Sequence, residues 1–126
     1  MQPSGQDTTK VLIAEDDDWM REVLGLLLAD EGLTPVEARS GPETITVARE
    51  ECPDLIVLDV SLPGRSGFEV LAELREGRTT HDTPVLLMSG NTNIHESGHA
   101  FEADAVLHKP LDFAEFLDKL RQLAPA

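Results

Sequence analysis

Four consecutive acidic residues, Glu15 to Asp18, follow a short apolar run and precede an amphipathic stretch. Asp17 or Asp18 could cap a helix there, because carboxylates accept bonds from free N–H groups and favour the positive end of the helix dipole. Four adjacent carboxylates exceed what a cap needs, and they repel one another. Either they form a solvated acidic face, or a hard divalent cation bound through oxygen neutralises part of the charge.

Three further residues that could take part in chemistry stand at the ends of other apolar runs: Asp59 and Ser89 follow theirs directly, and Lys109 follows after His108. Carboxylates and water suit Mg²⁺, which often shares its coordination shell with a phosphoryl group. A carboxylate beside such a metal could attack phosphorus and form an acyl phosphate, while the lysine ammonium neutralises charge on the transferring group. Taken singly, Asp59 could equally be a strand-end acid, Ser89 a turn residue and Lys109 a surface cation.

Five short β-type runs alternate with helical stretches and would position these side chains. The runs lie at 11–14, 34–38, 55–58, 84–88 and 105–107. The alternation predicts parallel pairing with right-handed crossovers, and the run LIVL at 55–58 is apolar throughout, as a strand covered on both faces must be. We therefore predict an α/β fold, a doubly wound (βα)5 sandwich with a parallel five-stranded sheet. Ligands of such sheets bind outside the carboxyl ends of the strands.

Helix start and stop signals fall between these runs. The first helical stretch has apolar residues at helical spacing and is expected to end near Gly32. Three later helix starts carry the capping-box pattern, a short polar residue followed three positions later by glutamate: Ser40 with Glu43, Ser66 with Glu69, and Asp112 with Glu115. The interval 91–104 contains many residues that form helices poorly, so we expect it to be short, irregular or mobile.

Length and composition limit the possible functions. The 126 residues fit one domain, expected at 10–123 after a flexible tail at 1–9. A formal net charge of −14, from 10 basic against 24 acidic residues, argues against nucleic-acid binding. The sequence has no apolar run of about 18 residues and no secretory leader, and its single cysteine excludes an internal disulfide framework. We therefore expect a cytoplasmic protein without a membrane span.

Four motifs, in order along the chain, resemble those of the receiver domains of two-component response regulators. They are IAEDD at 13–17, LDVSLPGRSG at 58–67, MSG at 88–90 and HKP at 108–110, and the resemblance covers nearly the whole chain. The resemblance implies a flavodoxin-like sandwich with strand order 2-1-3-4-5. It also implies a protein that a sensor histidine kinase or a histidine phosphotransfer protein phosphorylates, and that signals to a downstream protein partner by conformational change.

The resemblance assigns the phosphoryl-transfer roles to the strand-end residues. Asp59 would be the phosphoacceptor, Ser89 would bond one phosphoryl oxygen after transfer, and Lys109 would pair with another. The Lys109–Pro110 bond is a candidate for a cis peptide, as X-Pro bonds in tight turns can be.

The same resemblance assigns a Mg²⁺ (or Mn²⁺) site to part of the acidic run. Asp16 would bind the metal directly and Glu15 through water, while Asp59 and the backbone carbonyl of Ser61 would complete the protein's share of the ligands. Asp17 and Asp18 are then left as a helix cap and a surface acid.

Two other functions compete with a phosphorylatable receiver. One is a degenerate receiver that recognises a partner without phosphorylation. The other is a metal-dependent phosphatase or nuclease, but such sites commonly need a second carboxylate two residues after the strand-end acid, and here that position is Ser61. We therefore expect a protein that catalyses only its own phosphorylation and dephosphorylation and is not an enzyme acting on an external substrate.

Two features depart from the family's pattern. Val106 stands three residues before Lys109, where many receivers carry an aromatic residue that turns inward on activation, and the interval from Ser89 to Lys109 is shorter than is common. His95 and His99 have the spacing of two ligands on one helix face but lack an evident third ligand, so we do not expect them to bind metal. The aromatic residues are expected to pack inside the protein: Trp19, Phe68, Phe101, Phe113 and Phe116.

Overall fold

The computed structural model describes residues 9–90 and 103–124. The elements in this part of the chain are β1 (Lys10–Ala14), α1 (Asp18–Asp30), β2 (Thr34–Ala38), α2 (Gly41–Glu51), β3 (Leu55–Asp59), α3 (Gly67–Glu76), β4 (Val85–Ser89), β5 (Ala105–His108) and α4 (Phe113–Leu123). The predicted tail, apart from its last residue, and most of the interval 91–104 lie outside the described residues. His95, His99 and Phe101 lie outside them as well.

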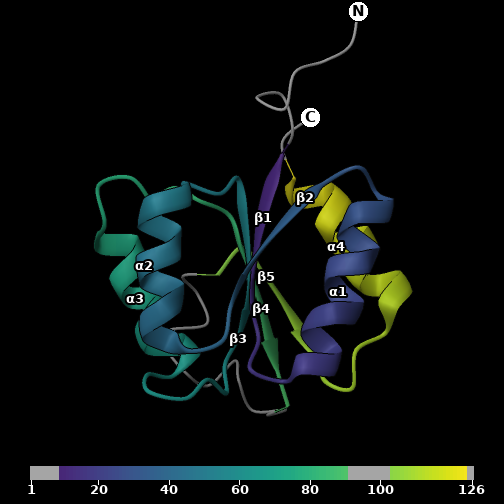
Figure 1. Cartoon of the computed structure of the whole chain (residues 1–126), viewed down its shortest axis with the longest axis horizontal. Helices are drawn as coiled ribbons and strands as arrows, with labels where there is room; N and C mark the ends of the chain where they lie inside the picture. The colour runs from purple at the N-terminus through teal and green to yellow at the C-terminus, as the bar shows by residue number, and fades with distance from the viewer. Residues whose placement is uncertain (1–8, 91–102, 125–126) are drawn as a thin grey trace, which may run out of the picture.

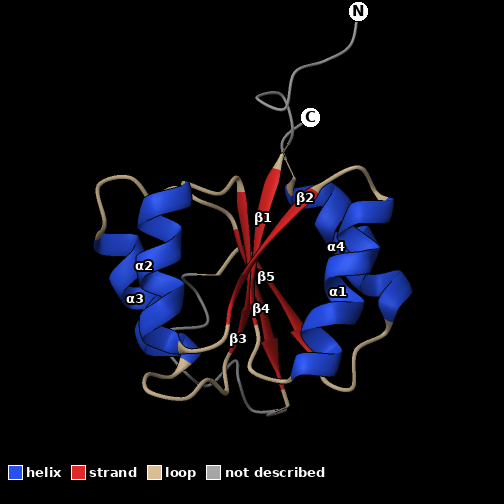
Figure 2. Cartoon of the chain, in the orientation of Figure 1, coloured by secondary structure: helices blue, strands red, loops and turns tan. Residues whose placement is uncertain are grey.

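All five strands pair in parallel in the order β2-β1-β3-β4-β5, which confirms the predicted doubly wound α/β fold. Helices α1 and α4 cover one face of the sheet and α2 and α3 cover the other (Figure 1). Coloured by secondary structure, the strands form a single layer between two layers of helix (Figure 2). The carboxyl ends of the strands therefore meet at one edge of the sheet.

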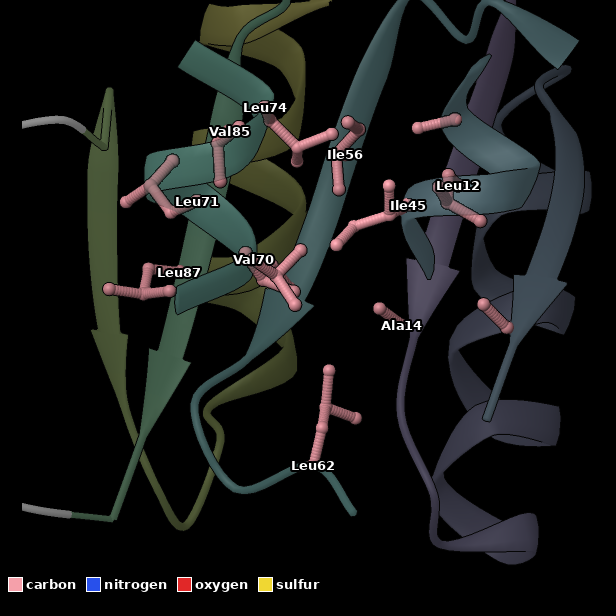
Figure 3. Packing of buried hydrophobic residues seen from close by; sticks show 13 residues of the cluster. Leu12, Ala14, Ile45, Ile56, Leu62, Val70, Leu71, Leu74, Val85 and Leu87 are labelled. Atoms are coloured by element: carbon pink, nitrogen blue, oxygen red, sulfur yellow. The ribbon is translucent and has the colours of Figure 1, made fainter. Parts of the chain in front are cut away.

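The central strands carry apolar side chains on both faces, and this divides the core into two clusters. In β1, Leu12 and Ala14 belong to the cluster beneath α2 and α3, whereas Val11 and Ile13 belong to the cluster beneath α1 and α4. Figure 3 shows the first cluster, in which side chains from α2 and α3 meet those of β1, β3 and β4. Strand β3 is buried at every position, as LIVL predicts. Its last residue, Asp59, is therefore held on a rigid and fully covered strand.

The helix caps lie at the residues that the sequence signals predict. Asp17 is the N-cap of α1, and its carboxylate accepts a hydrogen bond from the Met20 N–H at 3.0 Å. Ser66 and Glu69 form a complete capping box at the start of α3. The α4 cap Asp112 also accepts bonds from the backbone N–H groups of the first turn.

The α2 cap departs from the predicted pattern. The Ser40 hydroxyl accepts a bond from the Glu43 N–H as expected. The Glu43 carboxylate, however, accepts from the Arg39 N–H, one residue before the cap. In a complete capping box the Ser40 N–H would donate to the Glu43 carboxylate, and here the Arg39 N–H donates to it instead.

Two aromatic side chains that were predicted to pack inside the protein, those of Trp19 and Phe113, are exposed in the structure. Trp19 was expected to pack but is 64% exposed, because it lies on the solvent side of the first turn of α1. Phe116 is fully buried as predicted, whereas Phe113 remains 36% exposed and Phe68 is half-buried. The fourth strand runs from Val85 to Ser89, one residue later than predicted.

Strand β2 is one of the two edges of the sheet. The Thr34 N–H donates to the Thr9 carbonyl at 2.9 Å, and the Ala38 carbonyl accepts from the Glu15 N–H at 3.1 Å. The peptide groups of alternate β2 residues therefore bond to β1, and those of Pro35 and Glu37 point away from the sheet. Within the described part of the chain, no helix is long and apolar enough to cross a membrane.

Candidate functional site

Three carboxylates converge at the carboxyl edge of the sheet. Potential ligand oxygens of Glu15, Asp16 and Asp59 all lie within 4.8 Å of one another. Glu15 and Asp59 are buried, with 1% and 2% of their surface exposed, whereas Asp16 is open to solvent. Three oxygen donors with one side open to water fit Mg²⁺, which binds through a few carboxylates and keeps several waters.

The strand order accounts for this convergence. Strands β1 and β3 are neighbours in the sheet, with Ala14 opposite Leu58, so the next residue of each strand brings Glu15 beside Asp59. Asp16 follows where the chain leaves the sheet toward α1. The parallel order alone thus makes residues more than forty positions apart in the sequence neighbours in space.

Lys109 reaches the same site from the end of β5. Its Nζ lies 2.8 Å from Asp59 Oδ2 and 3.2 Å from Glu15 Oε1, so one ammonium bridges both buried carboxylates. The Lys109 N–H donates to the Ser89 carbonyl at 2.7 Å, and the Lys109–Pro110 peptide is cis, as predicted.

The electrostatics of the site follow from burial and from the pairing of like charges. Burial, followed by the hydrogen bond and negative charge of Asp59, raises the pKa of Glu15 to about 7, although the Asp17 N–H and the Lys109 ammonium act to lower it. Burial alone would lower the pKa of Lys109, but its bonds to Asp59 and Glu15 outweigh this effect and raise that pKa. Without metal, the site therefore holds a proton near neutral pH and keeps Lys109 charged.

Ser61 and Ser89 lie at the rim of this group. The Ser61 N–H donates to Asp59 Oδ1 at 3.0 Å, the carboxylate oxygen that Lys109 does not contact. Ser89 is the last residue of β4, the strand next to β3, and is 1% exposed. The structure thus brings Glu15, Asp16, Asp59 and Lys109 together with the Ser61 backbone, while the metal role of the Ser61 carbonyl and the phosphoryl role of Ser89 stay predictions.

The loop after Asp59 is held by unusually close backbone contacts. A Cβ at Gly67 would lie 2.4 Å from the Asp59 carbonyl oxygen, so only glycine lets α3 begin this close to the end of β3. A Cβ at Gly41, the first residue of α2, would lie 2.4 Å from the Arg65 carbonyl oxygen, and the Gly41 N–H donates to the Pro63 carbonyl at 3.0 Å. Two helix starts therefore hold this loop in place.

The sequence reasoning missed one buried charged residue beside the site. Arg21 is 4% exposed and donates a hydrogen bond from Nη1 to the Glu15 carbonyl at 2.9 Å. The signal was a charged residue on the core face of α1, three and seven positions before the buried Leu24 and Leu28. Such a position usually holds an apolar side chain, so its arginine marks a buried polar contact.

Comparisons with known proteins point to one family. The sequence pattern of the family described as the response regulator receiver domain matches residues 11–121. YkoG of Bacillus subtilis, an uncharacterized transcriptional regulatory protein, is 36% identical over 113 residues, which make up 88% of this chain and 49% of YkoG. The phosphate regulon transcriptional regulatory protein PhoB of Escherichia coli is 30% identical over 114 residues, covering 89% of this chain and 50% of PhoB. The chain thus spans about half the length of these relatives.

Solved structures agree with this match. The response regulator TrrA of Thermotoga maritima, solved in complex with Mg²⁺-BeF, has a TM-score of 0.85 and 28% identity, with 92% of this chain and 99% of TrrA covered. TrrA has also been solved in complex with the histidine kinase ThkA, and that structure has a TM-score of 0.82, with 92% of this chain and 98% of the matched chain covered. The chain therefore belongs to the response regulator receiver domain family.

Proposed function

We propose that this chain is a phosphorylatable receiver, which accepts a phosphoryl group from a phosphohistidine partner onto Asp59 and signals by a change of conformation. The observation that carries the proposal is the bridge from Lys109 Nζ to both Asp59 and Glu15, within a cluster that also holds Asp16. A degenerate receiver has no need to keep two buried carboxylates and an ammonium in contact, because burying charged groups costs free energy.

The proposed chemistry is an in-line transfer to the Asp59 carboxylate. A carboxylate oxygen of Asp59 forms a bond to phosphorus as the P–N bond to the partner histidine breaks, and the leaving imidazole takes up a proton. Lys109 already lies 2.8 Å from Asp59 Oδ2, so its ammonium is in place to pair with a phosphoryl oxygen after transfer. The Ser89 hydroxyl would bond a second phosphoryl oxygen.

The metal site of this proposal uses the carboxylates of Glu15, Asp16 and Asp59 with the carbonyl of Ser61. A bound Mg²⁺ or Mn²⁺ would neutralise negative charge on the transferring group, which is where phosphoryl-transfer catalysis chiefly acts. The chain's own residues set the conditions for binding, because Glu15 must release the proton that its raised pKa retains and Lys109 must share the two buried carboxylates.

The proposed partners are a sensor histidine kinase or a histidine phosphotransfer protein, and a downstream protein. The complex of TrrA with ThkA supports the first, because this chain is 28% identical to TrrA along nearly its whole length. We propose no turnover of an external substrate, since the position two residues after Asp59 is Ser61, which supplies no carboxylate as general acid or base. A cytoplasmic location stays a prediction.

Incubation of the protein with acetyl phosphate and Mg²⁺, followed by intact-mass measurement, tests the proposal. We expect the mass of one added phosphoryl group when Mg²⁺ is present, and no added mass when a chelator replaces the metal or in Asp59→Asn. Asp54→Asn is the matched control, because Asp54 is an aspartate beside the start of β1 and bonds the Lys10 N–H at 2.9 Å, at the far end of the sheet. Peptide mapping that places the group on Ser89 or on a histidine would contradict the assignment, and a chain that stays unmodified would favour the degenerate receiver.

A further inference from the structure

Arg21 is a buried cation beneath the acidic run. It lies on the core side of α1, between the helix and the sheet, with 5% of its side chain exposed. Burying an arginine is costly unless its donors are satisfied by well-placed acceptors. The acceptors that Arg21 binds therefore indicate the role of its side chain in the fold.

The guanidinium joins three separate elements. Its Nε donates to the Glu37 carboxylate of β2 at 3.1 Å, and its Nη2 donates to the Asp18 carboxylate at the start of α1. Its Nη1 donates to the backbone carbonyl of Glu15, at the end of β1, at 2.9 Å. The guanidinium is planar and its N–H groups point in fixed directions. The three bonds together therefore fix the orientation of the three acceptors, the two carboxylates and the Glu15 carbonyl.

The Glu15 carbonyl belongs to the peptide group that links Glu15 to Asp16. Changes in the two backbone dihedrals that flank it, ψ of Glu15 and φ of Asp16, would turn the two carboxylates relative to each other. The Glu15 N–H is already fixed by its bond to the Ala38 carbonyl at 3.1 Å, and Glu15 Oε2 accepts from the Asp17 N–H at 3.2 Å. Arg21 adds a side-chain bond to the carbonyl end of the residue.

We propose that Arg21 is a positioning residue for the divalent-cation site, which orients the peptide between Glu15 and Asp16 so that both carboxylates face Asp59. This inference rests on the proposed function, because it assigns Arg21 to the same metal site. In this proposal Arg21 acts by orienting the metal ligands. Its positive charge would by itself repel a cation.

Geometry and charge make opposite predictions for this residue. Removal of a positive charge beside a cation site should, by Coulomb's law alone, tighten cation binding. Removal of a group that orients the ligands should weaken it, and loss of such supporting contacts typically costs about 10- to 100-fold in metal affinity. The direction of the change therefore separates the two roles.

The test measures Mg²⁺ affinity of the full chain by calorimetry in the wild type, Arg21→Met, Arg21→Lys and Arg121→Met. Arg121→Met is the matched control, because Arg121 donates two bonds to the Glu31 carboxylate, at 2.7 and 3.2 Å, at the opposite end of α1. We expect about tenfold weaker binding in Arg21→Met, an intermediate loss in Arg21→Lys, whose ammonium is a point charge without the planar fork, and no loss in Arg121→Met.

Phosphorylation by acetyl phosphate supplies a readout that general destabilisation would not reproduce. In Arg21→Met, the Mg²⁺ concentration for half-maximal rate should rise about tenfold while the rate at saturating Mg²⁺ stays near that of the wild type. A lowered plateau with unchanged half-saturation would contradict positioning of the metal ligands. The proposal would be overturned if Arg21→Met binds Mg²⁺ as tightly as the wild type or more tightly. If Arg21→Met does not fold, a wild-type Mg²⁺ affinity in Arg21→Lys overturns it.

Amide hydrogen exchange without metal separates this inference from the proposed function. The Glu15 and Asp17 amides should exchange faster in Arg21→Met, whereas the amides of β3 should keep their rates. Unchanged exchange at Glu15 and Asp17 would refute the positioning role. A wild type that binds no Mg²⁺ would refute the proposed function, while the exchange rates would still decide whether Arg21 orders this segment.

Discussion

Glu15 and Asp18 stand three residues apart in one acidic run, yet their surroundings act on them in opposite directions. Burial and the neighbouring Asp59 raise the pKa of Glu15 to about 7. The hydrogen bond from Arg21, and then its positive charge, lower the pKa of Asp18, which is exposed to solvent. Carboxylates that look equivalent in the sequence are thus divided by the fold into buried acids, Glu15 and Asp59, and helix-start acids, Asp17 and Asp18.

This division separates groups that cost stability from groups that add to it. The buried acids repel each other and rely on Lys109 and on the raised pKa of Glu15, as is common where a site is arranged for a ligand. The helix-start acids are neutralised locally, by the free N–H groups of α1 and by Arg21. Substitution of either kind of acid, or of the cation that neutralises it, therefore tests this division.

Lys109→Met should have the largest effect, because it removes the cation shared by the buried acids. We expect the rate of phosphorylation by acetyl phosphate to fall about 100- to 1000-fold, as for loss of one group that stabilises transition-state charge. The pKa of Glu15 should rise further, since the Lys109 ammonium is one of the groups that lower it. NMR titration of the Glu15 side chain, with rates measured on the same samples, checks both effects, and an unchanged rate would show that Lys109 has no part in transfer.

Glu15→Gln should remove most of the pH dependence of stability between about pH 4.5 and 7. In the metal-free protein, the pKa of Glu15 is about 7 against 4.5 for an ordinary glutamate, so the folded state binds more protons than the unfolded state in this range. Stability should therefore decrease as pH rises from about 4.5 to about 7, by about 3 kcal/mol in total, and level off above the folded pKa. Denaturation by urea in the presence of a chelator measures this slope.

The control for this titration is Asp18→Asn. The lowered pKa of Asp18 places its titration below the range in question, so this variant should keep the slope. If the unfolding free energy of Glu15→Gln still decreases with pH over this range, another group causes the pH dependence. Glu15 and Asp18 would then not differ in the way described.

Mg²⁺ should stabilise the folded state, because it binds where the buried acids repel one another. At a concentration near 100 times the dissociation constant, the gain is about 2.7 kcal/mol, or a rise in Tm of about 10 °C. Asp16→Ala should lose this shift, whereas Asp30→Ala, which removes an exposed aspartate at the other end of α1, should retain it. Thermal denaturation with and without Mg²⁺ decides, and a full shift in Asp16→Ala would remove Asp16 from the metal site.

Asp17→Ala should have the smallest of the four effects. It removes the cap of α1, which costs about 1 kcal/mol, and leaves the buried acids in place. Asp18→Ala should cost less than Asp17→Ala, because the Asp18 carboxylate is exposed to solvent and water can take its place at Nη2 of the buried Arg21. Urea denaturation of both variants tests the order, and the reverse order would show that the pair with Arg21 outweighs the cap.

The sequence predicted the fold because its signals agree with one another. The LIVL run, the alternating strands and helices, and the cap at Ser66 each favour the same architecture, and the structure confirms it. The convergence of Glu15 and Asp59 followed from the strand order that the resemblance supplied. Periodicity alone could not have provided it, because it does not say which strands are neighbours.

The features that could not be predicted depend on side-chain environment. Trp19 is exposed although large aromatic residues usually pack, because helical spacing does not fix which side of the first turn faces the sheet. Arg21 was overlooked because a charged residue in a sequence suggests the surface, and two of its three acceptors, the Glu37 carboxylate and the Glu15 carbonyl, lie outside its own helix and are brought to it by the fold. The raised pKa of Glu15 likewise depends on burial that no local pattern encodes.

The edge strand β2 limits how copies of this protein can aggregate. Sheet edges promote aggregation when they offer a row of free N–H and C=O groups to another chain. The outward-pointing peptide groups of β2 belong to Pro35 and Glu37, and proline has no N–H, so this short edge offers a single donor, beside an exposed carboxylate. The edge is thus a poor template for an incoming strand, and the net charge of −14 adds repulsion between copies, which favours colloidal stability at high concentration.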